Sequence, residues 1–462
     1  MNLSEAMNIG RNALIASSRG SQVAAQNLAN ATTPGYTRRT VELESIPMAL
    51  GGGVRAGNVT RAVDPYLERR GLGARSYSGE AEAKVKTLAV VDTVFADGQG
   101  SVGDALDAFD SALTDLSVSP QSVPTRQVVL ARADDLAKAF TRAQDALGQA
   151  RTDANERITS DVKDVNIKLD RIGELNKQIV AGKNSHEDVG DLEDQRDELI
   201  RGVSDALPVQ VLNDASGAVA VVLSGSRDLV SVDSQVHHLV TTLDSTSGAV
   251  TISRDTAGAM EDITSFFTTG SIGGTISARD GALLDAQNSL DQLAYDISTA
   301  YNTQHAAGVD LTGATGRNLF NAPATVTGAA KNFGVSADVA GQPRNIAAAQ
   351  AATSLPGDNR NALALVGLHD AKLALGGTAT AQQSFSFMVA AAGGAARAAQ
   401  DQSEYAESSV TQIEALRQSY AGVSTDEEMM NIMKFQRSYQ AALRVVETAD
   451  QMLQSLLNMR AG

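Results

Sequence analysis

The residues with the clearest chemical signature form a glycine-rich string, Gly98-Gln99-Gly100-Ser101-Val102-Gly103, which fits the GxGxxG pattern of dinucleotide-binding turns. An apolar run, Leu88 to Phe95, precedes the string, and a helix-like segment follows it. A dinucleotide fold needs a second strand after that helix, with an acidic residue at the end of the strand. The segment from Ser117 to Thr125 predicts instead a proline-containing turn into another helix. We therefore interpret the string as a turn between helices and predict no cofactor.

Histidines are the next candidates, because imidazole groups bind metal ions. The five histidines lie on different predicted elements and lack metal-ligand spacing. Two of them are adjacent, but in a strand their side chains would face opposite sides. Cysteine is absent, which excludes thiolate ligands and disulfides. We predict no metal site at these residues: His186, His237, His238, His305 and His369.

A run of carboxylates could bind a cation or serve as a catalytic pair. Arg196 and Arg201 interleave with the acidic residues, and leucine and isoleucine supply an apolar side to the same segment. This pattern is typical of a solvated helix face with local ion pairs. There is no GxSxG elbow and no Walker loop, so we predict that the protein is not an enzyme. The acidic residues are Asp191, Glu193, Asp194, Asp197 and Glu198.

Composition excludes further classes of function. The chain has 462 residues and a formal net charge of −16, which argues against nucleic acid or an anionic membrane as the main partner. Residues 1–30 lack the features of a cleavable signal peptide, and no segment approaches the length of a membrane span. Composition alone therefore predicts a cytoplasmic protein of two to four domains.

The elements that would position any site are mainly helical. Helical spacing is interrupted by a region of period-two, β-branched runs and then resumes, which predicts an elongated fold of nested, discontinuous domains with an inserted β domain. The chain is predicted to contain strands at 40–44 and 51–60, helices within 65–118 and 126–179, strands within 207–253, helices from 283 to 301, loops over 308–331, and helices within 361–420.

The two ends of the chain carry heptad-spaced stripes that predict long helices paired like a coiled coil. Gly10, Ser17 and Ser21 keep the N-terminal stripe small, so that another helix can approach closely. An antiparallel pair that closes a single chain would also account for the stripes, but we favour an assembly interface. The predicted interface residues are Leu3, Met7, Leu14, Leu28, Pro34, Gly35, Tyr36, Ile432, Phe435, Tyr439, Leu443, Val446, Leu453 and Leu457.

The acidic residues 426–428 have a local explanation. Ser424 or Thr425 can cap the helix, Glu427 or Glu428 can complete a capping box, and the negative charges complement the helix dipole. Contact with a neighbouring subunit is the alternative.

Several motifs carry a resemblance to a known family. The two ends resemble the signatures of the bacterial flagellar rod, hook and hook-associated proteins, and the centre resembles the helical domain of the hook-associated protein 1 family. The terminal motifs are Asn27–Asn30, Thr33–Arg38, Gly422–Glu428, Phe435–Ala441 and Thr448–Leu453, and the central ones include Glu174–Ile179, Asp191–Leu199 and Asn302–Phe320. Hook and rod proteins lack this helical centre, and flagellins lack the Thr-Pro-Gly-Tyr turn, so both are weaker alternatives.

The resemblance implies a structural function. It implies a hook–filament junction protein that polymerises at the distal end of the hook and adapts the hook to the filament. Implied partners are other copies of the chain, the hook protein, a second junction protein and an export chaperone at the C-terminal region. It also implies type III export to the extracellular flagellum. The expected domains are an axial assembly domain (1–33 and 424–462), a mainly helical domain (34–206 and 270–423) and an outward-facing β domain (207–269).

Overall fold

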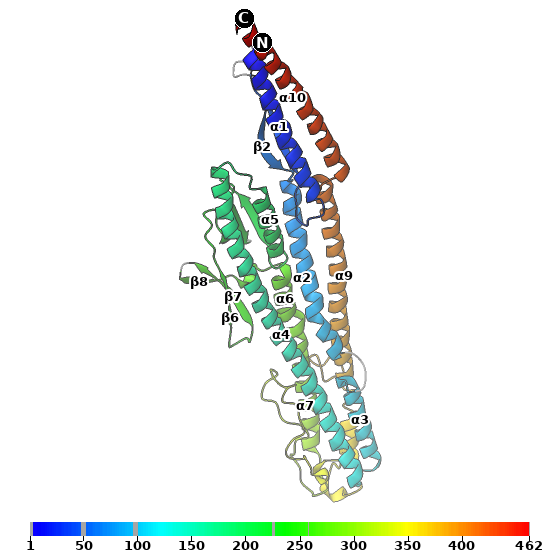
Figure 1. Cartoon of the computed structure of the whole chain (residues 1–462). Coiled ribbons are helices and arrows are strands. Elements are labelled where there is room, and N and C mark those ends of the chain that lie inside the picture. The colour runs from blue at the N-terminus through cyan, green and yellow to red at the C-terminus, as the bar shows by residue number, and fades with distance from the viewer. Residues whose placement is uncertain (1–2, 48–51, 96–99, 224–226, 257, 462) are drawn as a thin grey trace.

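The computed structural model describes residues 3–47, 52–95, 100–223, 227–256 and 258–461. The molecule is an elongated rod in which helices from both halves of the sequence run side by side (Figure 1). The longer helices are α1 (Leu3–Ala29), α2 (Pro65–Phe95), α3 (Val102–Val118), α4 (Val123–Asn184), α5 (Gly190–Ser204), α6 (Gly270–Ala278), α7 (Leu284–Ala307), α8 (Arg360–Val366), α9 (Ala381–Ala421) and α10 (Thr425–Ala461).

The strands form small antiparallel sheets with the orders β1-β2, β3-β4-β5 and β6-β7-β8. The β region predicted for 207–253 extends to Asp262, and the strand predicted from His237 begins at Leu239. The strands are β1 (Arg39–Ser45), β2 (Val54–Arg61), β3 (Val209–Asn213), β4 (Val219–Leu223), β5 (Arg227–Val230), β6 (Leu239–Leu243), β7 (Val250–Thr256) and β8 (Ala259–Asp262).

The first half of the chain closes against the second half. Helix α1 packs with α10, and α2 packs with α9, so that the chain forms one antiparallel helix pair in continuation of another. The first residues of α1 and the last residues of α10 lie at the same end of the rod (Figure 1). The prediction of a mainly helical fold with small inserted sheets and paired terminal helices is confirmed.

Serine residues cap the N-termini of two consecutive helices. Ser101 caps α3 by accepting a hydrogen bond from the backbone N–H of Asp104, and Ser122 caps α4 in the same way. Gly98 and Gln99 of the glycine-rich string lie outside the described residues. Its remaining residues lead into α3, which is followed by helix α4 and not by a strand. The described part of the string therefore fits the interpretation as a turn between helices.

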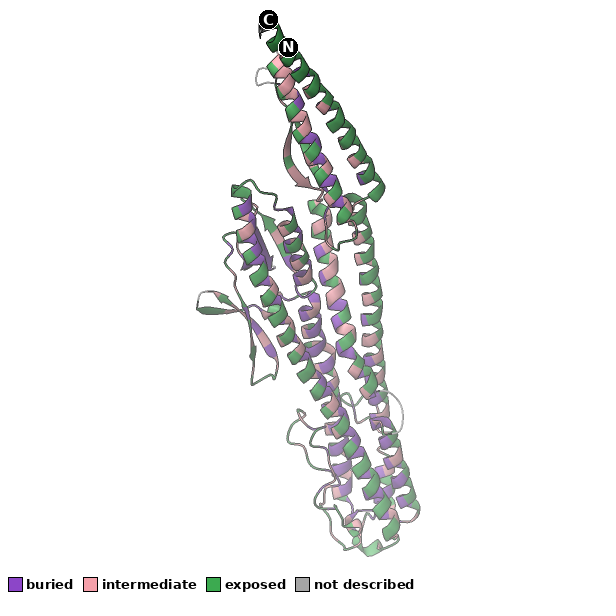
Figure 2. Ribbon diagram, viewed as in Figure 1, coloured by how far each residue is buried: buried purple, intermediate pink, exposed green. Residues whose placement is uncertain are grey.

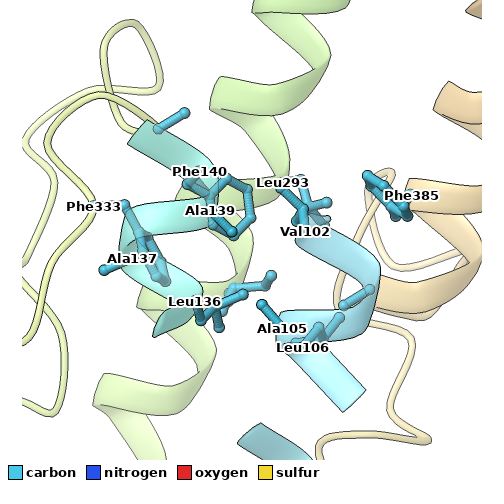
Figure 3. Close-up of a cluster of buried hydrophobic side chains, with 14 of the residues drawn as sticks. Val102, Ala105, Leu106, Leu136, Ala137, Ala139, Phe140, Leu293, Phe333 and Phe385 are labelled. Atoms are coloured by element: carbon cyan, nitrogen blue, oxygen red, sulfur yellow. The ribbon is translucent and has the colours of Figure 1, made fainter. Parts of the chain in front are cut away.

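The main core lies at the end of the rod away from the chain ends. Buried side chains of α3, α4, α7 and the loop after α7 meet there, and Figure 3 shows part of this cluster. The ring centroids of Phe320 and Phe333 are 4.6 Å apart, and those of Phe140 and Phe333 are 4.8 Å apart. Burying each such ring stabilises the fold by about 1.5–3 kcal/mol. No helix in the described ranges has the length and apolar content to cross a membrane.

Helix α4 is 62 residues long, which corresponds to about 93 Å at 1.5 Å per residue. Three asparagines on α4 connect it to the β domain, and each amide binds strand backbone. Asn166 donates to the carbonyl of Leu239 (2.8 Å) and accepts from its N–H (2.9 Å). Asn176 makes the same pair with Val219 (2.8 and 3.2 Å). Asn155 donates to the carbonyl of Gly248 and accepts from the N–H of Val250.

Candidate assembly interface

The helices α1 and α10 approach each other closely at two glycines. A Cβ atom at Gly10 would lie 2.6 Å from the Val446 Cγ2 atom, and one at Gly20 would lie 2.4 Å from the Phe435 ring. Any larger residue at these positions would push the helices apart or displace the facing side chain. The small residues of α1 therefore allow close packing of two helices of the same chain. This is the antiparallel pair that was the alternative explanation of the stripes.

The predicted interface residues lie along this helix pair and at the turn that leaves it. None of them is fully buried, since the main neighbours of α1 and α10 in the described chain are each other and the short β1–β2 hairpin. Nine helix residues and two turn residues are half-buried: Leu3, Met7, Leu14, Leu28, Ile432, Phe435, Leu443, Val446, Leu453, Gly35 and Tyr36. The remaining three are exposed: Pro34, Tyr439 and Leu457.

Helix α10 exposes an apolar surface that its partner helix does not cover (Figure 2). Among its described side chains only Glu428, Ala442 and Ala449 are buried. Exposed apolar side chains that gather along one helix are a feature from which interaction surfaces are sought. We call this surface the α10 outer face, and its large apolar residues are Met429, Met430, Met433, Tyr439, Val445, Met452, Leu456, Leu457 and Met459.

The turn after α1 is held by one buried amide. The Asn27 side chain is fully buried, donates to the carbonyl of Arg39 (2.8 Å), and accepts from the Arg39 N–H (3.0 Å) and the Tyr36 hydroxyl (2.8 Å). Burial raises the pKa of Tyr36 to about 12, so the hydroxyl stays protonated and donates. Gly35 has a φ of +78°, a conformation that favours glycine. The direction in which α1 leaves the body of the rod is thus set by Asn27.

A second contact joins this turn to the start of α10. The backbone N–H of Arg38 donates to the carbonyl of Ala421 at the end of α9 (2.9 Å). The Arg38 guanidinium pairs with Glu427 and Glu428, both at 3.2 Å, and Glu428 is buried. Ser424 caps α10 by accepting from the Glu427 N–H, as predicted. The acidic residues therefore meet an arginine of the same chain in addition to the helix dipole.

The acidic residues of α5 form a partly buried ion-pair network, so the expectation of a solvated face with local pairs is wrong. Asp194 is 8% exposed and pairs with Arg39 from β1 (3.1 Å) and Arg61 from β2 (2.7 Å). Burial lowers the pKa of Arg61, but the carboxylates of Asp197, Asp194 and Glu193 outweigh it and raise the pKa above its usual value. These carboxylates thus attach the β1–β2 hairpin to α5.

Sequence reasoning missed Asn27, Arg38 and Arg39 as functional positions. Each belongs to or adjoins the N-terminal motif, but their partners lie up to 389 residues away in sequence. One signal was available, because Asn27 is a polar residue one position from the apolar stripe of α1.

The histidines have structural partners. His305 is buried between the carbonyl of Arg317 (2.8 Å) and the N–H of Ala347 (2.9 Å). His369 pairs with Asp110 at 2.9 Å. Within the described ranges no group of three or more histidine or carboxylate residues could hold a metal ion.

Comparisons with known proteins agree with this architecture. The family model of the flagellar hook-associated protein FlgK helical domain matches residues 88–320, and the C-terminal model of flagellar basal body rod FlgEFG proteins matches residues 417–459. Flagellar hook-associated protein 1 of Bacillus subtilis (strain 168) is 27% identical over 494 residues, covering 97% of this chain and 96% of that protein. Its counterpart in Salmonella typhimurium is 24% identical over 554 residues, covering 99% of this chain and 100% of that protein.

A solved structure shows the same fold. The flagellar hook junction protein FlgK from Burkholderia pseudomallei aligns with a TM-score of 0.69 and 18% identity, covering 78% of this chain and 100% of that one. Together the architecture and the matches define a structural protein of the bacterial flagellum. The chain belongs to the flagellar hook-associated protein FlgK family. This confirms the resemblance and the prediction of a non-enzymatic protein, because the family is structural.

Proposed function

We propose that this protein polymerises at the distal end of the hook and adapts the hook to the filament, with the α10 outer face as the surface that meets neighbouring subunits. The observation that carries this proposal is the exposure of that face. Met452, Leu456 and Leu457 are 54%, 54% and 64% exposed, although they are large apolar residues on one long helix. Burial against further axial helices would stabilise the assembly.

The proposed domain division follows from this function. Residues 1–33 and 424–462 would form the axial domain, residues 34–206 and 270–423 the helical domain, and residues 207–269 the outward-facing β domain. Hook protein, a second junction protein and other copies of the chain would be the neighbours in the flagellum. The predicted fourteen interface residues belong to this proposal.

The proposal includes a route to the outside of the cell. The protein would leave through the flagellar type III pathway without a cleavable signal peptide, bound before export by a chaperone at its C-terminal region. A chaperone would cover the same apolar residues of α10 that axial subunits cover later. One surface would thereby serve two successive partners.

Assembly onto isolated hooks tests the proposal. Replacing Met452 and Leu456 with serine removes apolar area that is exposed in the single chain, so the melting temperature of the purified protein should not change. Burying the exposed half of each side chain in an assembly is worth about 1 kcal/mol, so together they contribute about 2 kcal/mol. We expect the variant to bind hooks roughly thirty-fold more weakly in a co-sedimentation assay.

The matched control replaces two exposed polar residues of the same helix, Gln451 and Asn458, with serine. It should bind hooks like the unchanged protein. Equal binding of the apolar and polar double variants would contradict a role of the α10 outer face in assembly.

A further inference from the structure

The β domain closes some of its sheet edges and leaves others open. The two three-stranded sheets end at β3, β5, β6 and β8. The edge of β5 is bridged by the segment after it, through the pair Val230 and Val236. The edge of β6 is capped at Leu239 by the Asn166 amide. Two of the four edges are thus closed within the chain.

The outer edge of β3 has no such partner. Among the residues that the structure describes, its outward backbone groups make no hydrogen bond to another element. Beside the strand lies a cleft of about 780 Å³ that runs along its whole length, from Pro208 to Asn213. The opposite wall is α2, which contributes Leu72 and Tyr77, and Ile200 of α5 also lines the cleft. An open strand edge beside an apolar cleft is the arrangement that accepts an added strand.

The strand β8 is the complementary feature. It lies at the outer edge of the second sheet, in a hairpin that projects from the rod (Figure 1). Among the described residues, the backbone groups on its outer edge make no hydrogen bond to another element. Met260 is 53% exposed although it is apolar. The length of β8, four residues, is close to that of β3, five residues.

Charge favours the same pairing. Exposed Arg69 lines the cleft beside β3, and no ion pair involving it occurs among the described residues. Asp262 is exposed on β8, on the same face as Met260, because side chains alternate along a strand. If Met260 enters the cleft, Asp262, whose Oδ1 also accepts hydrogen bonds from Thr264, faces the wall that carries Arg69. The two carboxylates that line the cleft, Glu68 and Asp197, are already paired with Arg201 and Arg61.

We infer that β3 of one molecule binds β8 of a second copy of this chain by antiparallel or parallel strand addition. The contact joins two different surfaces, so it repeats from copy to copy and is compatible with a closed ring. This inference rests on the proposed function, since it supplies a lateral contact between subunits in the β domain, separate from the α10 outer face.

Cysteine cross-linking tests the contact, because the chain contains no cysteine of its own. Leu212 and Ala259 are exposed; Leu212 lies at the rim of the cleft, and Ala259 lies on the face of β8 opposite Met260. Leu212→Cys and Ala259→Cys proteins are mixed and treated with a short bis-maleimide, which tolerates a register shift of two residues. Because each protein in the mixture carries a single cysteine, a cross-linked product of twice the monomer mass must join two molecules. The mixture is tested both on isolated hooks and as concentrated protein without hooks.

We expect the mixed proteins to cross-link and each single variant to cross-link at least ten-fold less. Adding Met260→Asp to the Ala259→Cys protein should lower the cross-linked fraction at least ten-fold, whereas Met260→Leu should preserve it. Because the side chain of Met260 is exposed, its substitution should leave the fold intact, and circular dichroism melting checks this directly. The positional control is Leu243→Cys on β6, where the side chain is 62% exposed.

Absence of cross-linking in both preparations overturns the inference, as does equal cross-linking by the Leu243→Cys control. Self-linking of Leu212→Cys alone also overturns it, because it indicates a symmetric β3 contact. Protein that sediments with hooks without this cross-link leaves the proposed function standing and refutes the strand contact. Protein that cross-links in solution but does not sediment with hooks supports the strand contact and refutes the proposed function.

Discussion

Replacing Asn27 with leucine should release α1 from the body of the rod without unfolding the rod itself. The leucine side chain has the same branched framework as the fully buried amide and is bulkier, so no cavity forms. The N–H and carbonyl of Arg39 lose their partner, and each buried backbone group left unpaired costs about 1–3 kcal/mol. The Tyr36 hydroxyl is half-buried and can turn toward water. The expected local cost is therefore about 2–6 kcal/mol.

Native-state hydrogen exchange measures this cost peptide by peptide. Since 1.4 kcal/mol corresponds to a factor of ten, we expect amide exchange in α1 and the β1–β2 hairpin to accelerate at least about thirty-fold. Exchange in α7 and in residues 123–150 of α4 should not change, because their core lies at the other end of the rod. Asn30→Leu is the matched control, since the Asn30 amide donates only to the Gln26 carbonyl nearby. Equal exchange in the two variants, or acceleration throughout α4, would refute the assignment of Asn27.

Three further outcomes are expected. The contact of His369 with Asp110 should weaken as the pH rises. The protonated imidazole donates a hydrogen bond to the Asp110 carboxylate, which raises the pKa of His369 above 6.5, while burial raises the pKa of Asp110. The stabilisation is therefore complete between the raised pKa of Asp110 and pH 6.5, and it is lost as the pH rises through the pKa of His369. Thermal melting at pH 6 and pH 8 measures this loss, and the difference should vanish in His369→Gln; an unchanged difference would refute it. Asn176→Leu should destabilise the β domain by about 2–4 kcal/mol, because strand backbone groups lose the amide that pairs with them; urea unfolding checks the value, and no shift of the midpoint would count against the role of the α4 asparagines. Replacing Leu453 and Leu457 with serine should leave the melting temperature of the core unchanged while weakening capture by an export chaperone; a pull-down that recovers full binding together with a large fall in melting temperature would reverse the assignment.

The sequence predicts elements that depend on local pattern and misses contacts that depend on distance. Heptad spacing predicts the terminal helices, helical spacing predicts the long helix at 126–179, which extends from Val123 to Asn184 in the structure, and period-two runs predict the interruption by strands. The network on α5 could not be predicted, because Arg39 lies 152 residues before its partner Asp191. Helical periodicity relates a residue only to those three or four positions away along the sequence. On that basis the α5 segment looks like a solvated helix face. The α4 asparagines were missed for the same reason, since an asparagine within a polar helix face gives no sign that a strand lies beside it.

For the predicted interface, spacing identifies which side of each terminal helix is apolar, but not how much of it one partner covers. The contact of Gly20 with Phe435 could not be read from either stripe alone, because it depends on the register between helices at opposite ends of the chain. Whether a neighbouring subunit covers the remaining apolar area depends on the assembly. The exposed side chains of the folded chain point to this possibility, and the sequence alone does not show which side chains are exposed.

The pairing of α1 with α10 also has a consequence for the timing of folding. Arg38 and Glu427 are 389 residues apart, so α1 is synthesised long before the helix with which it pairs. The core of α3, α4 and α7 can form earlier, because its contacts join residues that are closer in sequence. The entropic cost of bringing α1 to α10 grows only slowly with the length of the chain between them. The pair nevertheless cannot form until α10 has been synthesised. A chain interrupted between α9 and α10 contains every residue of the main core but leaves α1 without its partner helix. The proposed assembly domain can therefore form only after the whole chain from α1 to α10 has been synthesised.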